Sequence, residues 1–545
     1  MSDEKHLNSY DSTPKTNSMS SISSQPSDEI VTSNKEKPKW YKRFKMKNMF
    51  EKIEDRPTPP QVYNYRIYMT AIMASAAAII IGYDGGFIGG TVALDSFKQE
   101  FGLDDSAHSS FIISNVISVF HAGCFFGALF SYPFSFYLGR RIPLIIAAVL
   151  ITAGSAIMLA ASSSVGLGPI YAGRVMAGVA VGFSTNLTVV YISEIAPPAI
   201  RGQLTSSYEI GWRVGDLVGF WINYGVDSHI PDGKKQWFIP FAIQLIPSVN
   251  QVKQSIEEQK QKVGLGILDP FYEVFFNNKL VLRRLLITMT IYVVCNFLGI
   301  QSINYYSPVI FKSLGIKGTN ASLFSTGMFG IVKFGCTFIY ILFIVDTIGR
   351  RKAFMASSAV CSICFWYIGA YLKLNDPTKP GVDAGPGGKA AIGMMYIWIA
   401  SFILAWSGGP FVVGSEVFDQ NIRSFVQAIN AAMSWVPIFI MSRFTTNMIR
   451  TMQYGIYFFF AALAVCTIPF IFFCLPETKG IALEDMDRLF SPDLPAWRAN
   501  KVVMSEVQHE TEEIFHENHE EGLFTTADNK PKTENVEDIL VKESV

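Results

Sequence analysis

Long apolar segments alternate with short polar loops over the middle of the chain, from about residue 66 to residue 475. A helix needs about 20 predominantly apolar residues to cross the hydrocarbon core of a bilayer. The pattern therefore predicts an all-α integral membrane protein. Eleven segments are long enough, and we expect transmembrane helices near 66–90, 111–134, 142–162, 170–192, 205–225, 284–308, 323–345, 353–372, 391–417, 425–446 and 454–475.

One further apolar segment, QWFIPFAIQLIPS at 236–248, is shorter than the others. At about 1.5 Å per residue its helix would cover about 20 Å of a core that is about 30 Å thick. The next residues, VNQVKQSIEEQKQK, are too polar to continue a helix through lipid. This short segment is the main irregularity of the pattern.

Basic residues in the loops favour a crossing at 236–248 all the same. Lys and Arg concentrate in the cytoplasmic loops of membrane proteins. If 236–248 crosses, the loop charges of both halves lie on the side of the N-terminus. We therefore expect twelve helices, a short helix six, and both termini in the cytosol. The loop residues concerned are Arg140, Arg141, Arg201, Arg283, Arg284, Arg350, Arg351, Lys352 and Arg423.

These boundaries divide the chain into five parts. We expect a disordered cytosolic tail with a basic juxtamembrane segment (1–64), a six-helix bundle (65–248), a truncated cytoplasmic linker (249–281), a second six-helix bundle (282–475) and an acidic cytosolic tail (476–545), which we expect to be disordered from Ser505. The basic segment carries aromatic residues and would favour an anionic membrane surface. A solvated linker with a topogenic charge explains it equally well.

Composition supports the membrane assignment. Hydrophobic residues make up 50% of the chain and charged residues 17%, against about 25% charged in soluble domains. Lys and Arg equal Asp and Glu at 45 each, so no basic excess indicates a nucleic-acid partner. The seven cysteines all lie in apolar segments, where they predict no extracellular disulfide framework. An ordinary cytosolic enzyme and a disordered scaffold are excluded.

Short motifs recur in the two halves of the chain. LGRR at 138–141 has a counterpart in IGRR at 348–351. Twelve helices in two related halves are the arrangement of transporters whose halves rock around a central substrate site. In each half an arginine follows a glutamate by seven residues, Arg201 after Glu194 and Arg423 after Glu416. Topogenic charge alone does not explain this match, so we expect these charges to latch the cytoplasmic helix ends. The latch residues are Arg140, Arg141, Glu194 and Arg201 in the first half, and Arg350, Arg351, Glu416 and Arg423 in the second.

Several longer strings carry a family resemblance. They are GYDGG (82–86), GRVMAGVAVG (173–182), SEIAPPAIRG (193–202), INYYSP (303–308), SEVFDQNIR (415–423) and PETKG (476–480). With them the chain resembles the sugar porter family of the major facilitator superfamily from about residue 62 to residue 490. Among its members the fungal quinate permeases are most similar, through YEIGW (208–212) and VGFWINYGVD (218–227). The resemblance implies the major facilitator fold, with two pseudo-symmetric six-helix bundles and alternating access.

The chain departs from the family pattern at two places. The motif that ends helix six in the family, and the short cytoplasmic helices after it, have no match between Ser248 and about Ile267. This fits a deletion or a wrongly predicted intron. In addition, Phe136 stands where the family has an acidic residue before its GRR motif, whereas Asp346 keeps that gating role in the second half.

Ionisable side chains in the apolar segments are candidates for function, because each costs about 2.5–3.5 kcal/mol at mid-bilayer on insertion scales. The resemblance places Asp84 and Arg174 where proton-coupled members have an acid and its arginine partner. Protonation of the acid would release the arginine and bias the rocking of the halves. A static structural pair is the alternative.

Helices five and eight carry further charges. Glu209 and Arg213 are four residues apart, on one helix face, and can neutralise each other; Asp216 follows on the same helix. Lys333 lies about 16 Å into its helix, near mid-membrane. Its ammonium group suits a carboxylate on the substrate. Pairing with Glu209 and snorkelling towards the membrane surface are the alternatives.

The resemblance adds residues that would contact or enclose the substrate. Cys295, Asn296 and Gln301 stand where the family has a sugar-contacting cluster of amides. Phe411, Ser434 and Trp435 match aromatic and polar positions of the cavity, and Tyr305 and Tyr306 match its extracellular gate. Together these groups would hold a hydroxylated ring.

We therefore expect a secondary transporter that couples protons to a small polyhydroxylated substrate, a quinate-like ring acid ahead of a neutral sugar. Its partners would be that substrate, protons and the lipid bilayer, and the family expectation is the plasma membrane. No ATP motif, catalytic motif or metal-ligand spacing is present, so we expect neither an enzyme nor a cofactor or metal. A transporter-like nutrient sensor and a transport-defective product of a truncated gene model are the alternatives.

Overall fold

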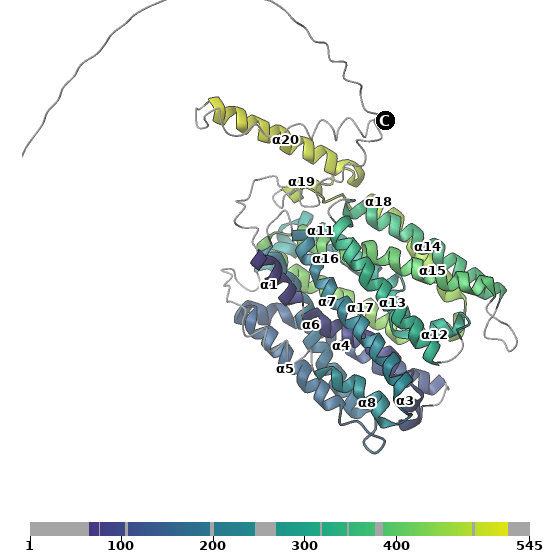
Figure 1. Cartoon of the computed structure of the whole chain (residues 1–545). Helices are drawn as coiled ribbons and strands as arrows, with labels where there is room; N and C mark the ends of the chain where they lie inside the picture. Colours follow the sequence, from purple (N-terminus) through teal and green to yellow (C-terminus); the bar gives the residue numbers. More distant parts are fainter. Residues whose placement is uncertain are drawn as a thin grey trace, which may run out of the picture. The chain divides into compact units, whose positions relative to one another are not determined.

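The computed structural model describes residues 65–75, 77–103, 107–196, 201–245, 269–316, 319–345, 348–375, 385–481 and 485–520. The regular structure of these residues is helical, with one isolated bridge between Ser162 and Gly166 (Figure 1). The first half contains α1 (Tyr65–Ser75), α2 (Ala77–Thr91), α3 (Asp95–Glu100), α4 (Ala107–Leu138), α5 (Arg141–Met158), α6 (Gly168–Ile195), α7 (Arg201–His229) and α8 (Lys234–Ile243).

The second half repeats this arrangement with more interruptions. It contains α10 (Asp269–Tyr272), η4 (Glu273–Asn277), α11 (Lys279–Phe297), α12 (Ile300–Ser313), α13 (Thr319–Ile339), η5 (Tyr340–Ile344), α14 (Arg350–Leu374), α15 (Pro386–Phe402), η6 (Ile403–Ser407), α16 (Gly409–Glu416), α17 (Gln420–Met452) and α18 (Gly455–Cys474), followed by α19 (Met486–Leu489) and α20 (Ala496–Glu520). A helix lies over each of the eleven segments that the hydropathy pattern predicts.

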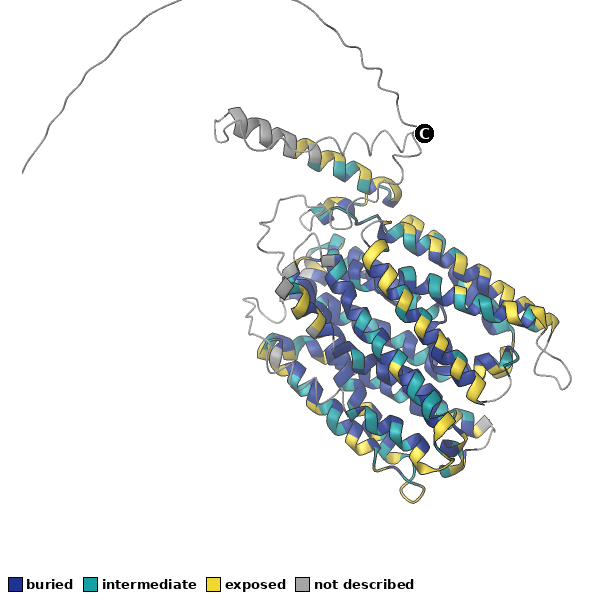
Figure 2. Ribbon diagram, viewed as in Figure 1, coloured by how far each residue is buried: buried dark blue, intermediate teal, exposed yellow. Residues whose placement is uncertain are grey.

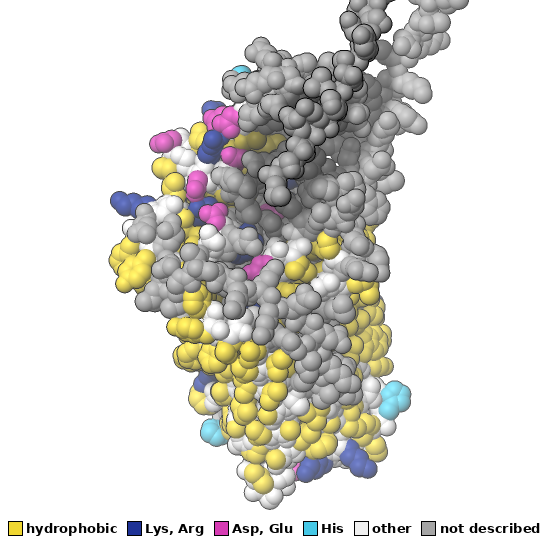
Figure 3. Space-filling model, turned by 90° about the vertical axis from the view of Figure 1, so that its left-hand side faces the viewer, with side chains coloured by type: hydrophobic (Ala, Val, Ile, Leu, Met, Phe, Trp, Pro, Cys, Tyr) yellow, Lys and Arg dark blue, Asp and Glu magenta, His cyan; other side chains and the backbone are white. Residues whose placement is uncertain are grey.

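Nine helical stretches within the described part of the chain are long and apolar enough to cross a membrane, and α5 is a shorter apolar helix. Helix α7 is 29 residues long, but its charges at 209, 213 and 216 lower its hydropathy. Buried residues fill the interior of the bundle, and exposed residues lie on its outer faces (Figure 2). On the face shown in Figure 3, hydrophobic side chains cover the middle, whereas Lys and Arg lie towards the ends.

Glycines set the close approach of α2 to α7. A Cβ atom on Gly82 would come within 1.8 Å of the Trp212 carbonyl oxygen, and one on Gly215 within 2.0 Å of the Ile79 carbonyl oxygen. Small residues allow helix backbones in a membrane to pack this closely. The GYDGG string therefore presses α2 against α7, which carries three of the buried charges.

Breaks in two helices expose polar groups to the centre of the bundle. Gly299, with a left-handed φ of +92°, separates α11 from α12. The π-helical turn η6 separates α15 from α16. Discontinuous helices of this kind line substrate sites in transporters, and π turns are common at functional sites.

The two halves meet along several helix pairs. Helices α4 and α17 lie side by side, as do α7 and α13, and α2 and α12 (Figure 1). Each pair joins a helix of the first half to one of the second. Any site built on these pairs lies between the halves.

Helix α8 is the described part of the predicted helix six. Its 10 residues cover about 15 Å, half of a hydrocarbon core. Trp237 and Phe241 are fully buried, and Gln244 reaches Asp84 in the middle of α2. Residues 246–268 lie outside the described residues, so the crossing by 236–248 stays a prediction.

The expectation of disorder from Ser505 is wrong as far as Glu520. Helix α20 extends to that residue, and Ala499 and Val503 on its inner face are fully buried. Trp497 stacks on Phe472 of α18 at 5.6 Å between ring centroids. The acidic composition of this segment favoured the prediction of disorder, although a short apolar face of α20 packs on the end of the bundle. Residues 1–64 and 521–545 lie outside the described residues.

Candidate functional site

Asp84 and Arg174 form a buried ion pair between α2 and α6. The two guanidinium nitrogens donate to the two carboxylate oxygens at 3.1 and 3.2 Å, and both side chains are fully buried. Gln244 adds a donor to Asp84 at 3.3 Å, and Arg174 lies over the Phe120 ring. The structure therefore brings together the acid and arginine that the resemblance singles out.

Four further charges form what we name the central charge cluster: Glu209, Arg213, Asp216 and Lys333. Arg213 donates to Glu209 at 2.7 Å and to Asp216 at 2.8 Å, all on α7. Lys333 of α13 forms an ion pair with Asp216 and donates to the Asn304 amide oxygen at 2.8 Å. All four side chains are buried, and their formal charges sum to zero. Buried charges are tolerated when they are paired in this way.

The central charge cluster joins the two halves. Ser407 of η6 donates to Glu209 and accepts from Arg213 at 2.9 Å. Lys333 and Asn304 also belong to the second half, whereas the other three charges belong to the first. Any relative movement of the halves must therefore rearrange these contacts.

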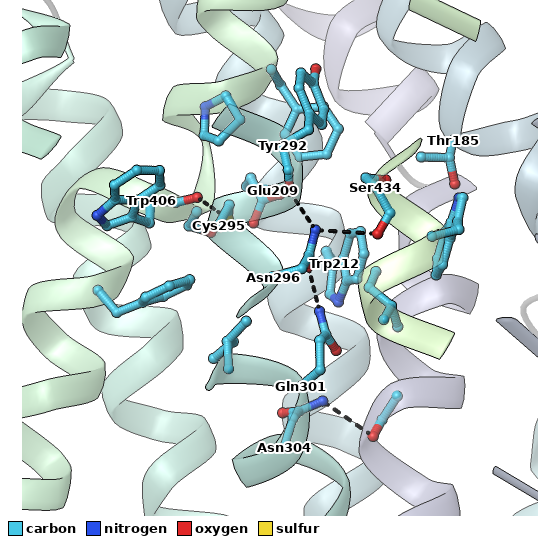
Figure 4. Close-up of a pocket in the computed structure, with 18 of the residues that line it drawn as sticks. Thr185, Glu209, Trp212, Tyr292, Cys295, Asn296, Gln301, Asn304, Trp406 and Ser434 are labelled. Atoms are coloured by element: carbon cyan, nitrogen blue, oxygen red, sulfur yellow. Dashed lines mark hydrogen bonds between the residues drawn. The ribbon is translucent and has the colours of Figure 1, made fainter. Parts of the chain in front are cut away.

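A pocket lies beside the cluster, between the halves (Figure 4). It brings together all nine residues proposed from the sequence for substrate binding: Glu209, Arg213, Cys295, Asn296, Gln301, Lys333, Phe411, Ser434 and Trp435. The void seen by a water molecule is about 60 Å³, enough for only a few waters.

Amides line one side of the pocket. Gln301 donates to the Asn296 side chain at 3.0 Å, and Asn296 donates to the Tyr292 carbonyl at 2.9 Å (Figure 4). Cys295 instead contacts the Trp406 carbonyl at 3.2 Å. The side-chain amides of Asn296 and Gln301 can turn to hydrogen-bond hydroxyl groups of a ligand, whereas the Cys295 thiol is bound to a backbone carbonyl.

Sequence reasoning left several pocket residues without a role. Asp216, and not Glu209, is the partner of Lys333, and its position seven residues after Glu209 on the same helix was the available signal. Asn304 and Ser407 carried no such signal, because their place in the site depends on the helix breaks at Gly299 and η6. Trp212 and Tyr292 also line the pocket.

His121 lies against two residues that line the pocket, Tyr305 and Trp435. Its Nε2 lies 2.8 Å from the Tyr305 hydroxyl, and its Nδ1 lies 3.1 Å from the Ser442 hydroxyl. Tyr306 donates to the Ser442 carbonyl at 2.7 Å and to the Ser114 hydroxyl of α4 at 3.3 Å. His121 belongs to α4 and its partners to α12 and α17, so the predicted gate tyrosines take part in contacts between the halves.

Matched ion pairs lie at the opposite, arginine-rich end. Arg140 donates to Glu194 at 2.6 Å, and Arg350 donates to Glu416 at 2.6 Å. Arg140 also contacts Ser135 and reaches Ser424 of α17 at 2.9 Å, which joins the halves.

The remaining latch residues have other contacts or are not described. Glu477 accepts from the backbone N–H groups of Arg350 and Arg351 at the start of α14, at 2.8 and 3.1 Å. Arg423 donates to the Phe418 carbonyl at 3.0 Å. Asp346 and the side chains of Arg141 and Arg201 lie outside the described residues.

Comparison with known proteins decides the family. The model of the family described as "Sugar (and other) transporter" matches residues 70–253 and 248–490. The chain belongs to this family. A probable quinate permease of Aspergillus niger is 44% identical to this sugar transporter over 540 residues, with 90% of this chain and 99% of the relative covered. A quinate permease of Emericella nidulans is 42% identical over 511 residues, with 85% and 95% covered.

Solved structures share the fold. The major facilitator superfamily proton:xylose symporter XylE bound to 6-bromo-6-deoxy-D-glucose aligns with a TM-score of 0.65 at 22% identity, covering 79% of this chain and 100% of that one. A partially occluded inward open conformation of XylE from E. coli aligns with a TM-score of 0.62 at 21% identity, covering 77% and 100%. The chain thus has the major facilitator fold. It is a multi-pass membrane transporter and not an enzyme.

The same comparisons bear on the irregular helix six of this sugar transporter. The family match is split into two parts that meet at residues 248–253. Since 90% of 545 residues is about 490, about 50 of the 540 positions aligned with the A. niger protein have no counterpart here. The chain is therefore shorter than its relatives internally, which agrees with the missing motif after Ser248.

Proposed function

We propose that this protein carries a polyhydroxylated ring acid, quinate or a close analogue, together with protons. The observation that carries the proposal is the ammonium group of Lys333 at the pocket, in reach of amide and aromatic side chains. A cation in a buried pocket favours an anionic ligand. The names of the quinate permease relatives support the same substrate class.

The pocket offers each kind of contact that such a ring needs. Lys333 would bind the carboxylate, and Asn296, Gln301 and Asn304 would bind hydroxyls. The rings of Trp435 and Phe411 would cover the apolar faces of the ligand. This combination of a few oriented polar groups with aromatic walls is typical of small-molecule sites.

Alternating access would expose the pocket to the two sides in turn. Contacts between the halves lie at both ends of the bundle. Opening one end would break the contacts of His121, and opening the other would break the contact between Arg140 and Ser424. We propose that the arginine-rich end and both termini face the cytosol, as the distribution of basic loops favours, in the plasma membrane.

Coupling to protons would use the Asp84–Arg174 pair. A proton on Asp84 would remove the charge that holds Arg174 and so change the balance between conformations. The likeness to a proton:xylose symporter concerns the fold, so this role is part of the proposal.

Uptake measurements test the proposal. The full-length protein, reconstituted in liposomes with an inward proton gradient, should accumulate labelled quinate, and unlabelled quinate should compete better than glucose or xylose. Saturable glucose uptake that quinate does not inhibit would contradict the substrate assignment.

A second candidate rests on the internal gap. A chain without the end of helix six would be a transport-defective product of a truncated gene model, and the split match at 248–253 favours this reading. Sequencing the transcript across codons 245–270 decides it. An additional coding segment there would show that the native protein is longer, whereas an uninterrupted transcript would support the chain as given.

A further inference from the structure

Asp216 has one carboxylate oxygen in use and one unused. Its Oδ2 accepts from both Arg213 and Lys333. Its Oδ1 is buried and has no hydrogen-bond donor among the described residues. It faces Gly85 of α2, where a Cβ atom would lie 3.3 Å from Oδ1. A buried acceptor without a donor is unfavourable.

Asp84 differs in this respect. Both of its oxygens accept from Arg174, and Gln244 provides a third donor. A proton on Asp84 would therefore add to an oxygen that already accepts a hydrogen bond. A proton on Asp216 would occupy an oxygen that has none.

The charge balance of the central charge cluster points to the same oxygen. Without a ligand its two acids and two bases cancel. A substrate carboxylate would bring a net negative charge into a buried site, which is unfavourable unless a cation or proton enters with it. Lys333 already donates to Asp216 and to Asn304, so a ligand carboxylate that binds Lys333 competes with the carboxylate of Asp216.

We propose that Asp216 is an internal substitute for the substrate's carboxylate. When an anionic substrate binds, its carboxylate takes the place of Asp216 on Lys333, and one proton from water adds to the freed Asp216 carboxylate. No bond of the substrate changes, and the cluster stays neutral. On release, Asp216 loses the proton and pairs with Lys333 again. This inference rests on the proposed transport of a ring acid.

Groups from every neighbouring element act on this proton. Glu209 and Arg213 lie on the same helix as Asp216, and Lys333 approaches from α13. Asn304 and Tyr305 approach from α12, and Asp84 lies on α2 next to Gly85. The two cations favour the ionised acid while the site is empty, and the arriving anion cancels that effect.

Proton uptake on binding tests the inference. Purified full-length protein in weakly buffered solution is mixed with sodium quinate or with its neutral amide, and binding is followed by the fluorescence of the pocket tryptophans. We expect about one proton taken up per quinate bound, none with the amide, and an affinity for quinate that rises about tenfold per unit fall in pH. Asp216→Asn should bind quinate without this proton uptake, whereas Asp227→Asn, in the same helix but outside the cluster, should retain it.

The outcomes separate the two proposals. Quinate binding to the wild type without proton uptake, or uptake that persists in Asp216→Asn, would overturn the role of Asp216 and leave quinate transport intact. Loss of proton uptake in Asp84→Asn, with quinate binding retained, would assign the proton to Asp84 and would also overturn the role of Asp216. This arm decides the matter even where Asp216→Asn cannot be purified. Failure of the wild type to bind quinate would overturn the proposed function itself.

Discussion

Lys333 of α13 and Asp216 of α7 form a fully buried ion pair between the two halves of the transporter. Removal of one member would leave the cluster with an uncompensated buried charge, which costs about 3–5 kcal/mol. A change at Lys333 therefore has two effects, a loss of stability and a loss of substrate recognition, and an experiment must distinguish them.

Lys333→Met should lower both thermal stability and quinate uptake. We expect uptake to fall about 10- to 100-fold, because a hydrogen bond to a charged group contributes about 1.5–3 kcal/mol. The double variant Lys333→Met/Asp216→Leu should recover much of the stability, since no charge is left unpaired, but not the uptake. Thermal unfolding followed by size-exclusion chromatography, with uptake of labelled quinate, checks both. Recovery of uptake in the double variant would contradict recognition by Lys333.

Asp84→Asn should separate substrate movement from proton drive. The variant can no longer exchange a proton at this position, so we expect counterflow of quinate between equal pools to continue while accumulation against a gradient falls to what a proton on Asp216 alone can drive. The acid stimulation of net uptake should fall in parallel. Accumulation that matches the wild type would leave the pair with Arg174 as a structural element only.

His121→Leu should weaken the closure of the pocket at its end of the bundle. The change removes contacts to Tyr305 and Ser442, each worth about 0.5–1.5 kcal/mol, and so shifts the population of the open state by about 30-fold. In a background with the native cysteines replaced, the introduced thiol of Ser114→Cys should react faster with a water-soluble maleimide when His121→Leu is present than when it is not.

His229→Leu is the matched control, because that histidine is exposed and contacts a carbonyl of its own helix at 3.1 Å. It should leave the rate unchanged. Equal rates in both variants and the wild type would show that His121 does not hold this end closed.

Gly215→Ala should destabilise the protein strongly, since the added methyl would meet the Ile79 carbonyl oxygen at 2.0 Å. Gly225→Ala in the same helix should be neutral or stabilising by about 0.5–1 kcal/mol, because no atom lies within 4 Å and alanine is the better helix former. Melting temperatures of the two variants check the difference. Similar values would refute the close approach of α2 and α7.

Local patterns in the sequence predicted the helices and most of the residues gathered at the site. Apolar length gave the positions of the crossings, and the four-residue spacing of Glu209 and Arg213 gave their ion pair. The partner of Lys333 could not be predicted in the same way, because it depends on the rotation of α7 against α13. His121 was missed because its partners lie 184 and 321 residues further along the chain. The fold of α20 was missed because its acidic residues outweigh its narrow apolar face.

The neutrality of the central charge cluster has a consequence for the response to voltage. Moving one elementary charge through a membrane potential changes the energy by about 2.3 kcal/mol per 100 mV. The four residues of the cluster cancel, and so do Asp84 and Arg174. The unloaded protein should therefore reorient at a rate that the potential hardly alters, and the loaded protein should respond as little, because quinate brings one proton with it.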